Sequence, residues 1–201
     1  MRITLIRHTT LAIEEGICYG QTDVDVSADF EREASALCAK LANMQFDAIY
    51  TSPLQRCYKL AEALCEDKNI EILDAQVKPD ARLKELHFGD WELQPWDNVP
   101  RDVFDIWAND YANLAPPNGE TFNQLQQRAK AFVAEVNQAY PLGHVLVVAH
   151  GGLIRALIAD ALELPLKRLF RIQVEYASLT QVTFPAKDAA VQVPKVHFIN
   201  R

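Results

Sequence analysis

Two histidines follow short apolar runs near opposite ends of this 201-residue chain. Residues 3–8 read Ile-Thr-Leu-Ile-Arg-His, and residues 145–150 read Val-Leu-Val-Val-Ala-His. Apolar runs of this length, rich in β-branched residues, are typical of buried strands, so each run predicts a strand with a histidine at its carboxyl end. Open α/β sheets bind ligands at that edge, and we therefore expect His8 and His150 to meet there.

Two arginines are expected at the same edge of the sheet. Arg7 precedes His8, and Arg56 falls in the first turn of a helix after a predicted strand over residues 46–50. Two guanidiniums bind a phosphate dianion through bidentate, charge-assisted hydrogen bonds, and a neutral imidazole between them can attack phosphorus. A lone strand-end histidine more often has a structural role, but the four side chains together favour phosphoryl transfer over acyl transfer.

Glu85 is a fifth candidate, in a segment where charged and aromatic residues alternate closely over residues 83–92. By itself, such a glutamate would be a solvated surface residue. Beside an imidazole and a leaving-group oxygen, its carboxyl group can supply the proton that lets an alkoxide depart.

These segments resemble, in order, the motif series of the histidine phosphatase superfamily, which has the phosphoglycerate-mutase-like fold. The resemblance rests on five motifs: Leu5-Ile6-Arg7-His8-Thr9, Ser52-Pro53-Leu54-Gln55-Arg56, Glu85-Leu86-His87-Phe88-Gly89-Asp90-Trp91-Glu92, Asn118-Gly119-Glu120-Thr121 and Val148-Ala149-His150-Gly151-Gly152. They span nearly the whole chain, and their common order argues against chance similarity.

The resemblance implies a role for each of these side chains. His8 is the nucleophile that forms a phosphohistidine, and Arg7, Arg56 and His150 hold the transferring phosphate. Glu85 acts first as the general acid and then as the base that activates water. The implied substrate is a small-molecule phosphomonoester, and neither a metal nor an organic cofactor is implied.

The sequence departs from the family pattern at two positions of the phosphate site. Thr9 stands where glycine is commonest, and Glu14 stands where many members have a phosphate-binding asparagine. We expect Gln21 to replace that asparagine as a donor, although it also suits a turn. Thr9 and Gly151 are assigned to the phosphate site with it.

The Arg-His-Thr motif and the loop over residues 18–23, Cys-Tyr-Gly-Gln-Thr-Asp, resemble the α-ribazole-5'-phosphate phosphatases of cobalamin biosynthesis. Five aromatic residues in or beside the segment 92–118 can present faces to a flat base: Trp91, Trp96, Phe104, Trp107 and Tyr111. We expect Trp91 to contact the substrate. Each aromatic residue is, however, also suited to packing that segment onto the sheet.

Three other functions stay open for the same motifs. They are a broad-specificity sugar or metabolite phosphatase, a phosphoglycerate-mutase-like enzyme, and an inactive member that binds a phosphorylated metabolite. A mutase is disfavoured because Arg101 is the only basic residue between Trp91 and Gly119 that can hold a second anionic group.

Two other classes of phosphatase are less consistent with the sequence. Asp23-Val24-Asp25-Val26-Ser27 resembles the signature of magnesium-dependent haloacid-dehalogenase-type phosphatases. The first aspartate of that signature should leave an apolar strand, whereas a turn-like sequence precedes Asp23. Cysteine phosphatase chemistry is also excluded, because no cysteine has an arginine six positions later.

The order of elements predicts an α/β three-layer sandwich with a mostly parallel sheet and helices on both faces. Residues 1–201 are expected to form a single domain with a small inserted cap over about 92–118. The further strands are expected near residues 70–73, 178–184 and 193–199. The helices are expected from Ser27 to about 44, from Ser52-Pro53 onward, weakly over 103–111, over 118–139 and over 152–162.

The bulk composition limits the partners of the chain. A formal charge of −7 and an isoelectric point near 5.2 disfavour nucleic acid and anionic membranes as partners. We expect a cytoplasmic protein, because no leader or membrane-length apolar segment is visible, and we expect its four cysteines to be reduced thiols. The oligomeric state does not follow from the sequence.

Overall fold

The structure is a computed structural model that describes residues 1–186, 189 and 192–201. Its described strands form one six-stranded sheet in the order β3-β2-β4-β1-β5-β6. They are β1 (Arg2–Arg7), β2 (Gln45–Thr51), β3 (Glu71–Pro79), β4 (His144–Ala149), β5 (Leu179–Thr183) and β6 (Lys195–Phe198). The pairs among β3, β2, β4 and β1 are parallel, while β5 is antiparallel to β1 and to β6. The predicted mostly parallel sheet is confirmed.

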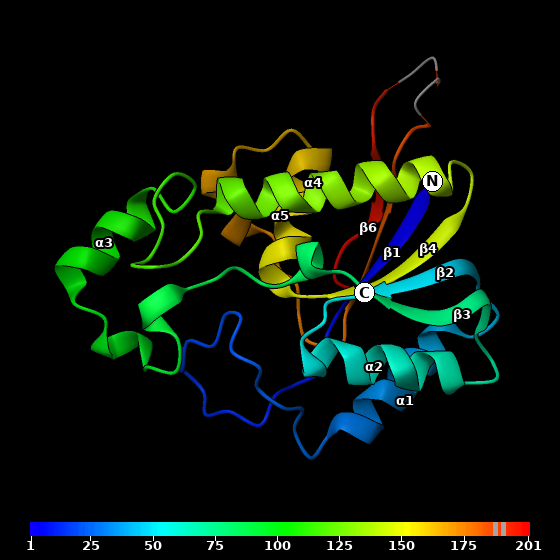
Figure 1. The fold of residues 1–201 in the computed structure, drawn as a ribbon, viewed down its shortest axis with the longest axis horizontal. Helices are drawn as coiled ribbons and strands as arrows, with labels where there is room; N and C mark the ends of the chain where they lie inside the picture. Colours follow the sequence, from blue (N-terminus) through cyan, green and yellow to red (C-terminus); the bar gives the residue numbers. More distant parts are fainter. Residues whose placement is uncertain (187–188, 190–191) are drawn as a thin grey trace.

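Helices cover both faces of this sheet (Figure 1). On one face, α1 (Phe30–Leu41) and α2 (Gln55–Glu66) share a hydrophobic cluster with Phe46 and Leu146. On the other face, α4 (Phe122–Ala139) and α5 (Gly151–Ala161) pack into a second cluster that includes Ile3 and Val147. Successive residues of the central strands point to opposite faces and both faces are buried, so these strands are apolar almost throughout. The expected three-layer sandwich is confirmed.

The register of the sheet brings three strand ends to one level. Arg7 of β1 is paired with Ala149 of β4, and Thr51 of β2 is paired with Val148. Because these strands are parallel, the residues that follow them leave the sheet at the same edge.

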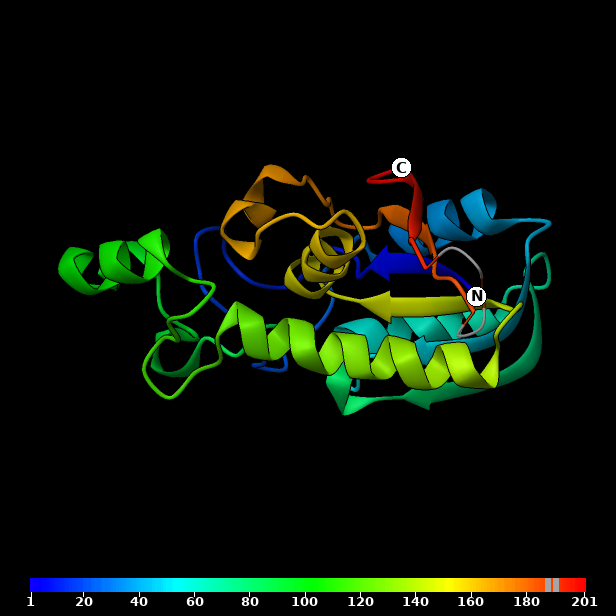
Figure 2. The same cartoon turned by 90° about the horizontal axis from the view of Figure 1, so that it is seen from above.

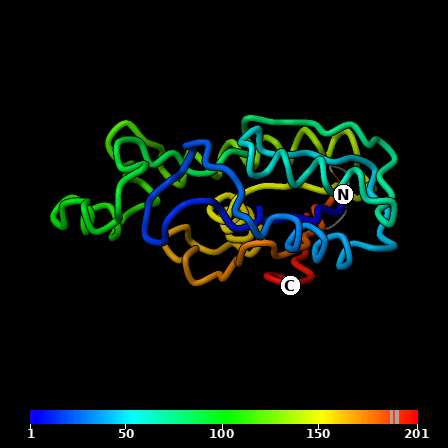
Figure 3. Tube along the Cα trace, turned by 90° about the horizontal axis from the view of Figure 1, so that it is seen from below, coloured from blue at the N-terminus to red at the C-terminus, as the bar shows by residue number. Residues whose placement is uncertain are grey.

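The segment 92–118 projects beyond that edge of the sheet (Figure 1). It contains α3 (Arg101–Asn109), close to the weak helical spacing predicted over 103–111. From above, α4 runs along the sheet and α3 lies beyond its end (Figure 2). The loop that follows β1 lies beside this segment (Figure 3), where Cys18 N–H donates to the Gln94 carbonyl at 2.9 Å.

Two of the predicted helix starts are wrong, and in each case a contact with a distant part of the chain is involved. α2 begins at Gln55 rather than at Ser52-Pro53, and Gln55 N–H donates to the side chain of Asp23 at 2.8 Å. This cap comes from a loop distant in sequence. α1 begins at Phe30, after Asp29, and Ser27 Oγ instead lies 2.7 Å from the hydroxyl of Thr10.

Other element boundaries differ less from the sequence expectations. β3 has 9 residues and is longer than the strand expected at 70–73; it lies at the edge of the sheet, and none of its residues is fully buried. α4 begins at Phe122 behind a capping box of Thr121 and Gln124, slightly later than expected. All four cysteines are free thiols, as predicted. Within the described residues, no helix has the length and apolarity needed to cross a bilayer.

Candidate active site

His8 and His150 meet at the predicted edge of the sheet. Their ring centroids are 5.1 Å apart, and the rings stand edge to face. His8 is the residue after β1, and His150 is the extended N-cap of α5. Their exposed fractions are only 1% and 0%, so both rings lie inside the protein.

The tautomer of His8 is set by its neighbour in sequence. His8 Nδ1 lies 2.8 Å from the carbonyl oxygen of Thr9, which can only accept a hydrogen bond. Nδ1 therefore carries the proton, and Nε2 keeps a free lone pair. Burial, assisted by the charges of Arg56 and Arg7, holds the pKa of His8 well below its ordinary value of 6.5. The ring is thus neutral at neutral pH, which is the form a nucleophile requires.

His150 is held differently, through both ring nitrogens. Nε2 lies 2.8 Å from Ser52 Oγ, and Arg56 Nε donates to Nδ1 at 3.3 Å. Burial and the charge of Arg56 keep the pKa of His150 well below 6.5. Because both nitrogens are engaged, a phosphate oxygen reaches His150 only by replacing one of these partners.

Arg56 and Arg7 supply positive charge without a carboxylate partner among the described residues. Arg56 is fully buried and donates to the carbonyls of Thr22 and Gly20 at 2.8 and 2.6 Å. Arg7 Nη1 donates to the carbonyl of Val174 at 2.7 Å. A buried guanidinium without a counter-charge is costly, so this arrangement favours the binding of an anion.

Two buried polar atoms beside His8 have no partner within the part of the chain that is described. They are Arg7 Nε and Thr9 Oγ1, which flank the histidine in sequence. A Cβ on Gly151 would lie 3.3 Å from Arg7 Nε, so only glycine leaves that nitrogen fully approachable. Unsatisfied buried donors are rare in native proteins and, in this position, indicate a site for a ligand oxygen.

A pair of tyrosines that the sequence did not single out borders the same site. Tyr19 Oη and Tyr176 Oη are 2.7 Å apart. The ring of Tyr176 lies 3.7 Å from Arg7 Cζ and 5.4 Å from the centroid of His8. Tyr176 therefore packs on the Arg7 guanidinium in a cation–π contact.

Glu85 is held through both oxygens of its side chain and through its backbone carbonyl. Leu86 N–H donates to Oε1 at 2.8 Å, and Gly152 N–H donates to Oε2 at 2.9 Å. The Glu85 carbonyl accepts from Arg128 Nη2 at 2.9 Å and from Gln21 Nε2 at 2.9 Å. A Cβ on Gly152 would overlap Glu85 Oε1, which explains the second glycine after His150.

Gln21 was expected to replace, as a phosphate donor, the asparagine that many family members have at the position of Glu14. The Gln21 amide is bound to the Glu85 carbonyl, and Glu14 is exposed. The role predicted for Gln21 in phosphate binding stays a prediction.

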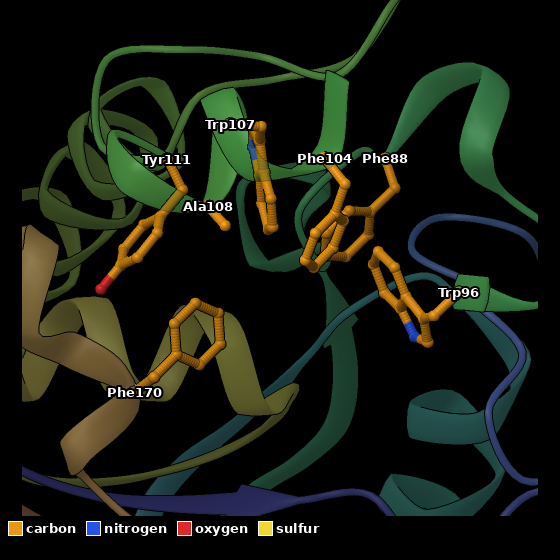
Figure 4. A pocket seen from close by; sticks show the side chains of 7 residues that line it. All are labelled: Phe88, Trp96, Phe104, Trp107, Ala108, Tyr111 and Phe170. Carbon is orange, nitrogen blue, oxygen red and sulfur yellow. The ribbon is translucent and has the colours of Figure 1, made fainter. Parts of the chain in front are cut away.

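Trp91 lies in the aromatic cluster of the segment 92–118, and its predicted contact with the substrate stays a prediction. It is 6% exposed and packs against Trp107, with centroids 5.4 Å apart, under α3. A separate pocket of about 320 Å³ opens beside it (Figure 4). That pocket is lined by Phe88, Trp96, Phe104, Trp107, Ala108, Tyr111 and Phe170. Trp91 packs within the aromatic cluster and is not among the residues that line this pocket.

The aspartates of the magnesium-dependent alternative have other partners. Asp23 caps α2 through Gln55 N–H, and Asp25 forms an ion pair of 2.6 Å with Lys59. Neither follows a strand of the sheet, as that chemistry requires. Among the described residues there is no group of three or more histidines, cysteines, aspartates and glutamates suited to a metal ion.

Comparison with known proteins agrees with this geometry. Residues 3–196 match the family model of the Histidine phosphatase superfamily (branch 1). The chain is 29% identical over 197 residues to the adenosylcobalamin/alpha-ribazole phosphatase of Escherichia coli, covering 96% of this chain and 95% of that protein.

Solved structures show the same fold. The mycobacterial glucosyl-3-phosphoglycerate phosphatase aligns with a TM-score of 0.84 at 28% identity, covering 99% of this chain and 98% of the other. The alpha-ribazole phosphatase of Shigella flexneri aligns with a TM-score of 0.85 at 24% identity, covering 100% and 96%.

Proposed function

Because this chain belongs to branch 1 of the histidine phosphatase superfamily and is a phosphatase, we propose that it hydrolyses α-ribazole 5'-phosphate through a phosphohistidine on His8. The observation that carries the proposal is the neutral ring of His8, with Nε2 unprotonated, beside the guanidiniums of Arg7 and Arg56, which have no carboxylate partner among the described residues. A phosphate dianion complements both features, because it takes the nucleophile at phosphorus and the two cations at its oxygens.

In the first step, His8 Nε2 attacks phosphorus and the bond from phosphorus to the ester oxygen breaks. Arg7 and Arg56 stabilise the charge on the transferring phosphoryl group. The carboxyl group of Glu85, in its protonated form, gives its proton to the departing alkoxide. The alcohol leaves, and His8 carries the phosphoryl group on Nε2.

In the second step, the Glu85 carboxylate takes a proton from water as the water oxygen attacks phosphorus. The bond from phosphorus to Nε2 breaks, which regenerates neutral His8 and releases inorganic phosphate. The hydrogen bonds from Leu86 and Gly152 keep the Glu85 carboxylate in one position through both steps.

The aromatic pocket supports a substrate with a flat apolar group. Its lining is almost entirely aromatic carbon, and Phe88 lies three residues after Glu85. Stacking on such rings contributes roughly 0.5–1.5 kcal/mol beyond burial. The dimethylbenzimidazole of α-ribazole has that shape, and the name of the E. coli relative includes this substrate.

We propose that residues 1–201 form one domain and that residues 92–118 act as its cap. We also propose that the enzyme hydrolyses its substrate rather than moving the phosphoryl group between two positions, as a mutase does. Arg101, the one basic residue between Trp91 and Gly119, is exposed and forms an ion pair of 2.8 Å with Asp105. It therefore adds no second anion site beside His8.

A phosphate-release panel tests the substrate. The panel compares α-ribazole 5'-phosphate with sugar phosphates, 3-phosphoglycerate, phosphoserine and nucleotides, each with and without a chelator. The proposal predicts the highest kcat/KM on α-ribazole 5'-phosphate and no effect of the chelator. A clear preference for a sugar phosphate would contradict the assignment to cobalamin biosynthesis, and activity restored only by magnesium would contradict the histidine mechanism.

A further inference from the structure

Arg155 lies next to the proposed phosphate site, although none of the family motifs pointed to it. It is in α5, four residues after Gly151, and positions four apart share one face of a helix. A Cβ on Gly151 would lie 2.9 Å from Arg155 Nη1 and 3.3 Å from Arg7 Nε. The two guanidiniums therefore both lie close to the same glycine.

The charge of Arg155 is not compensated by an ion pair within the described residues. Its Nε donates to the carbonyl of Ile172 at 2.8 Å, while Nη1 and Nη2 have no hydrogen-bond partner in that part of the chain. Burial and the nearby charge of Arg7 lower the pKa of Arg155. The carboxylates of Glu85 and Glu175 act in the opposite direction but accept no hydrogen bond from Arg155, so its outer nitrogens are available to a ligand.

Arg155 also borders the aromatic pocket. Its Cζ lies 5.9 Å from the ring centroid of Phe170, which lines the pocket. Phe170 in turn packs on Tyr111, another lining residue at the same end of the pocket, with centroids 5.0 Å apart (Figure 4). Arg155 therefore stands between Arg7 on the phosphate side and Phe170 on the apolar side.

We propose that Arg155 is a specificity residue, whose Nη1 and Nη2 groups donate to oxygen atoms that the substrate carries between its phosphate and its apolar end. The planar fork of a guanidinium fits two neighbouring oxygens, such as the hydroxyls of a ribose or a carboxylate. A substrate that extends from His8 to the aromatic pocket places such oxygens beside Arg155. This inference rests on the proposed function, and it names the part of the substrate that Arg155 binds.

Arg155→Gln separates this role from phosphate binding. We expect kcat/KM to fall by about 10- to 100-fold on α-ribazole 5'-phosphate, mainly through KM, because the oxygen atoms of the bound substrate lose a charged donor. On phenyl phosphate, which has no such oxygens, the loss should stay below about threefold. The inhibition constant of inorganic phosphate should be unchanged. Equal losses on both substrates, a parallel rise in that inhibition constant, or no loss on either would each overturn the proposal.

Two further variants control the experiment. Arg155→Lys keeps the charge and removes the fork, so it should show the same substrate dependence even if Arg155→Gln is too unstable to assay. Arg168→Gln changes an exposed arginine of the neighbouring segment 166–171 and should behave as wild type on all substrates. 3-Phosphoglycerate, which carries a carboxylate, distinguishes binding of a carboxylate by Arg155 from binding of ribose hydroxyls. A larger loss on 3-phosphoglycerate than on α-ribazole 5'-phosphate would indicate the carboxylate.

The proposed function and this inference fail in different ways. If the wild-type enzyme prefers another phosphomonoester, the α-ribazole assignment fails. The loss in kcat/KM caused by Arg155→Gln is then compared between that preferred substrate and phenyl phosphate. Equal losses would contradict the role of Arg155 without bearing on the phosphatase assignment.

Discussion

The backbone N–H of Gly152 donates to Glu85 Oε2 at 2.9 Å and thereby ties the proposed acid to the helix that follows His150. We expect Gly152→Ala to reduce kcat by about 10- to 100-fold, because the added Cβ would occupy the place of Glu85 Oε1. Steady-state kinetics measure the loss, and a melting curve shows whether the fold is retained. In a Glu85→Gln background the same change should cost little more, since both act through one carboxylate. Full additivity of the two losses would contradict the link.

Glu85→Gln should slow the reaction most where the leaving group needs a proton. We expect a loss of about 100-fold or more on an alkyl phosphate and a loss several times smaller on p-nitrophenyl phosphate, because nitrophenolate leaves without protonation. The test compares kcat/KM for the two substrates in the wild type and the variant, because kcat/KM reports the steps up to departure of the leaving group and not the later hydrolysis of phosphohistidine. Equal losses on both substrates would contradict the general-acid role.

The stacking of Tyr176 on Arg7 predicts a difference between two substitutions. Tyr176→Phe keeps the ring 3.7 Å from Arg7 Cζ and removes the contact between Tyr176 Oη and Tyr19 Oη. It should change the inhibition constant of inorganic phosphate by less than about threefold, whereas Tyr176→Leu should weaken phosphate inhibition by about tenfold. If the two variants weaken it equally, the hydroxyl pair rather than the ring positions Arg7.

A histidine far from the site should make the stability depend on pH. Burial lowers the pKa of His144 from 6.5 to about 4, and its Nε2 lies 2.8 Å from Thr4 Oγ1. Because the folded pKa is below the unfolded one, the contribution of His144 is complete above about pH 6.5 and is lost as the pH falls toward 4.

His144→Gln should therefore flatten the dependence of Tm on pH in that window. After allowance for partial exposure, the difference from wild type between these pH values is on the order of 1–2 kcal/mol in the free energy of unfolding. Thermal melts at several pH values measure it. Identical pH dependence in the wild type and the variant would contradict the lowered pKa.

The order of elements and the meeting of His8 with His150 could be predicted because both depend on local patterns. Apolar runs defined the strands, and parallel strands bring their carboxyl ends to one edge. Arg56 near the start of α2 followed from the same reasoning. The start of α2 itself could not be predicted, since its cap comes from Asp23, 32 residues away in sequence.

The parts of the site that depend on packing were not visible in the sequence. Trp91 was expected at the substrate, but whether an aromatic side chain faces a ligand or a neighbouring ring depends on how the residues of 92–118 pack on one another. Tyr176 and Arg155 belong to no motif, and only the structure shows both beside Arg7. The spacing of Gly151 and Arg155 on one helix was the one available signal for Arg155.

Trapping the phosphoenzyme tests the central claim most directly. The enzyme is mixed with substrate, quenched within milliseconds under alkaline conditions that preserve phosphohistidine, and mapped by mass spectrometry. The mechanism predicts a phosphoryl group on His8, which should accumulate further in Glu85→Gln when the substrate has a good leaving group. In His8→Ala, both the phosphoryl group and the activity should be lost. Turnover in His8→Ala, or a phosphoryl group on any other residue, would contradict the account.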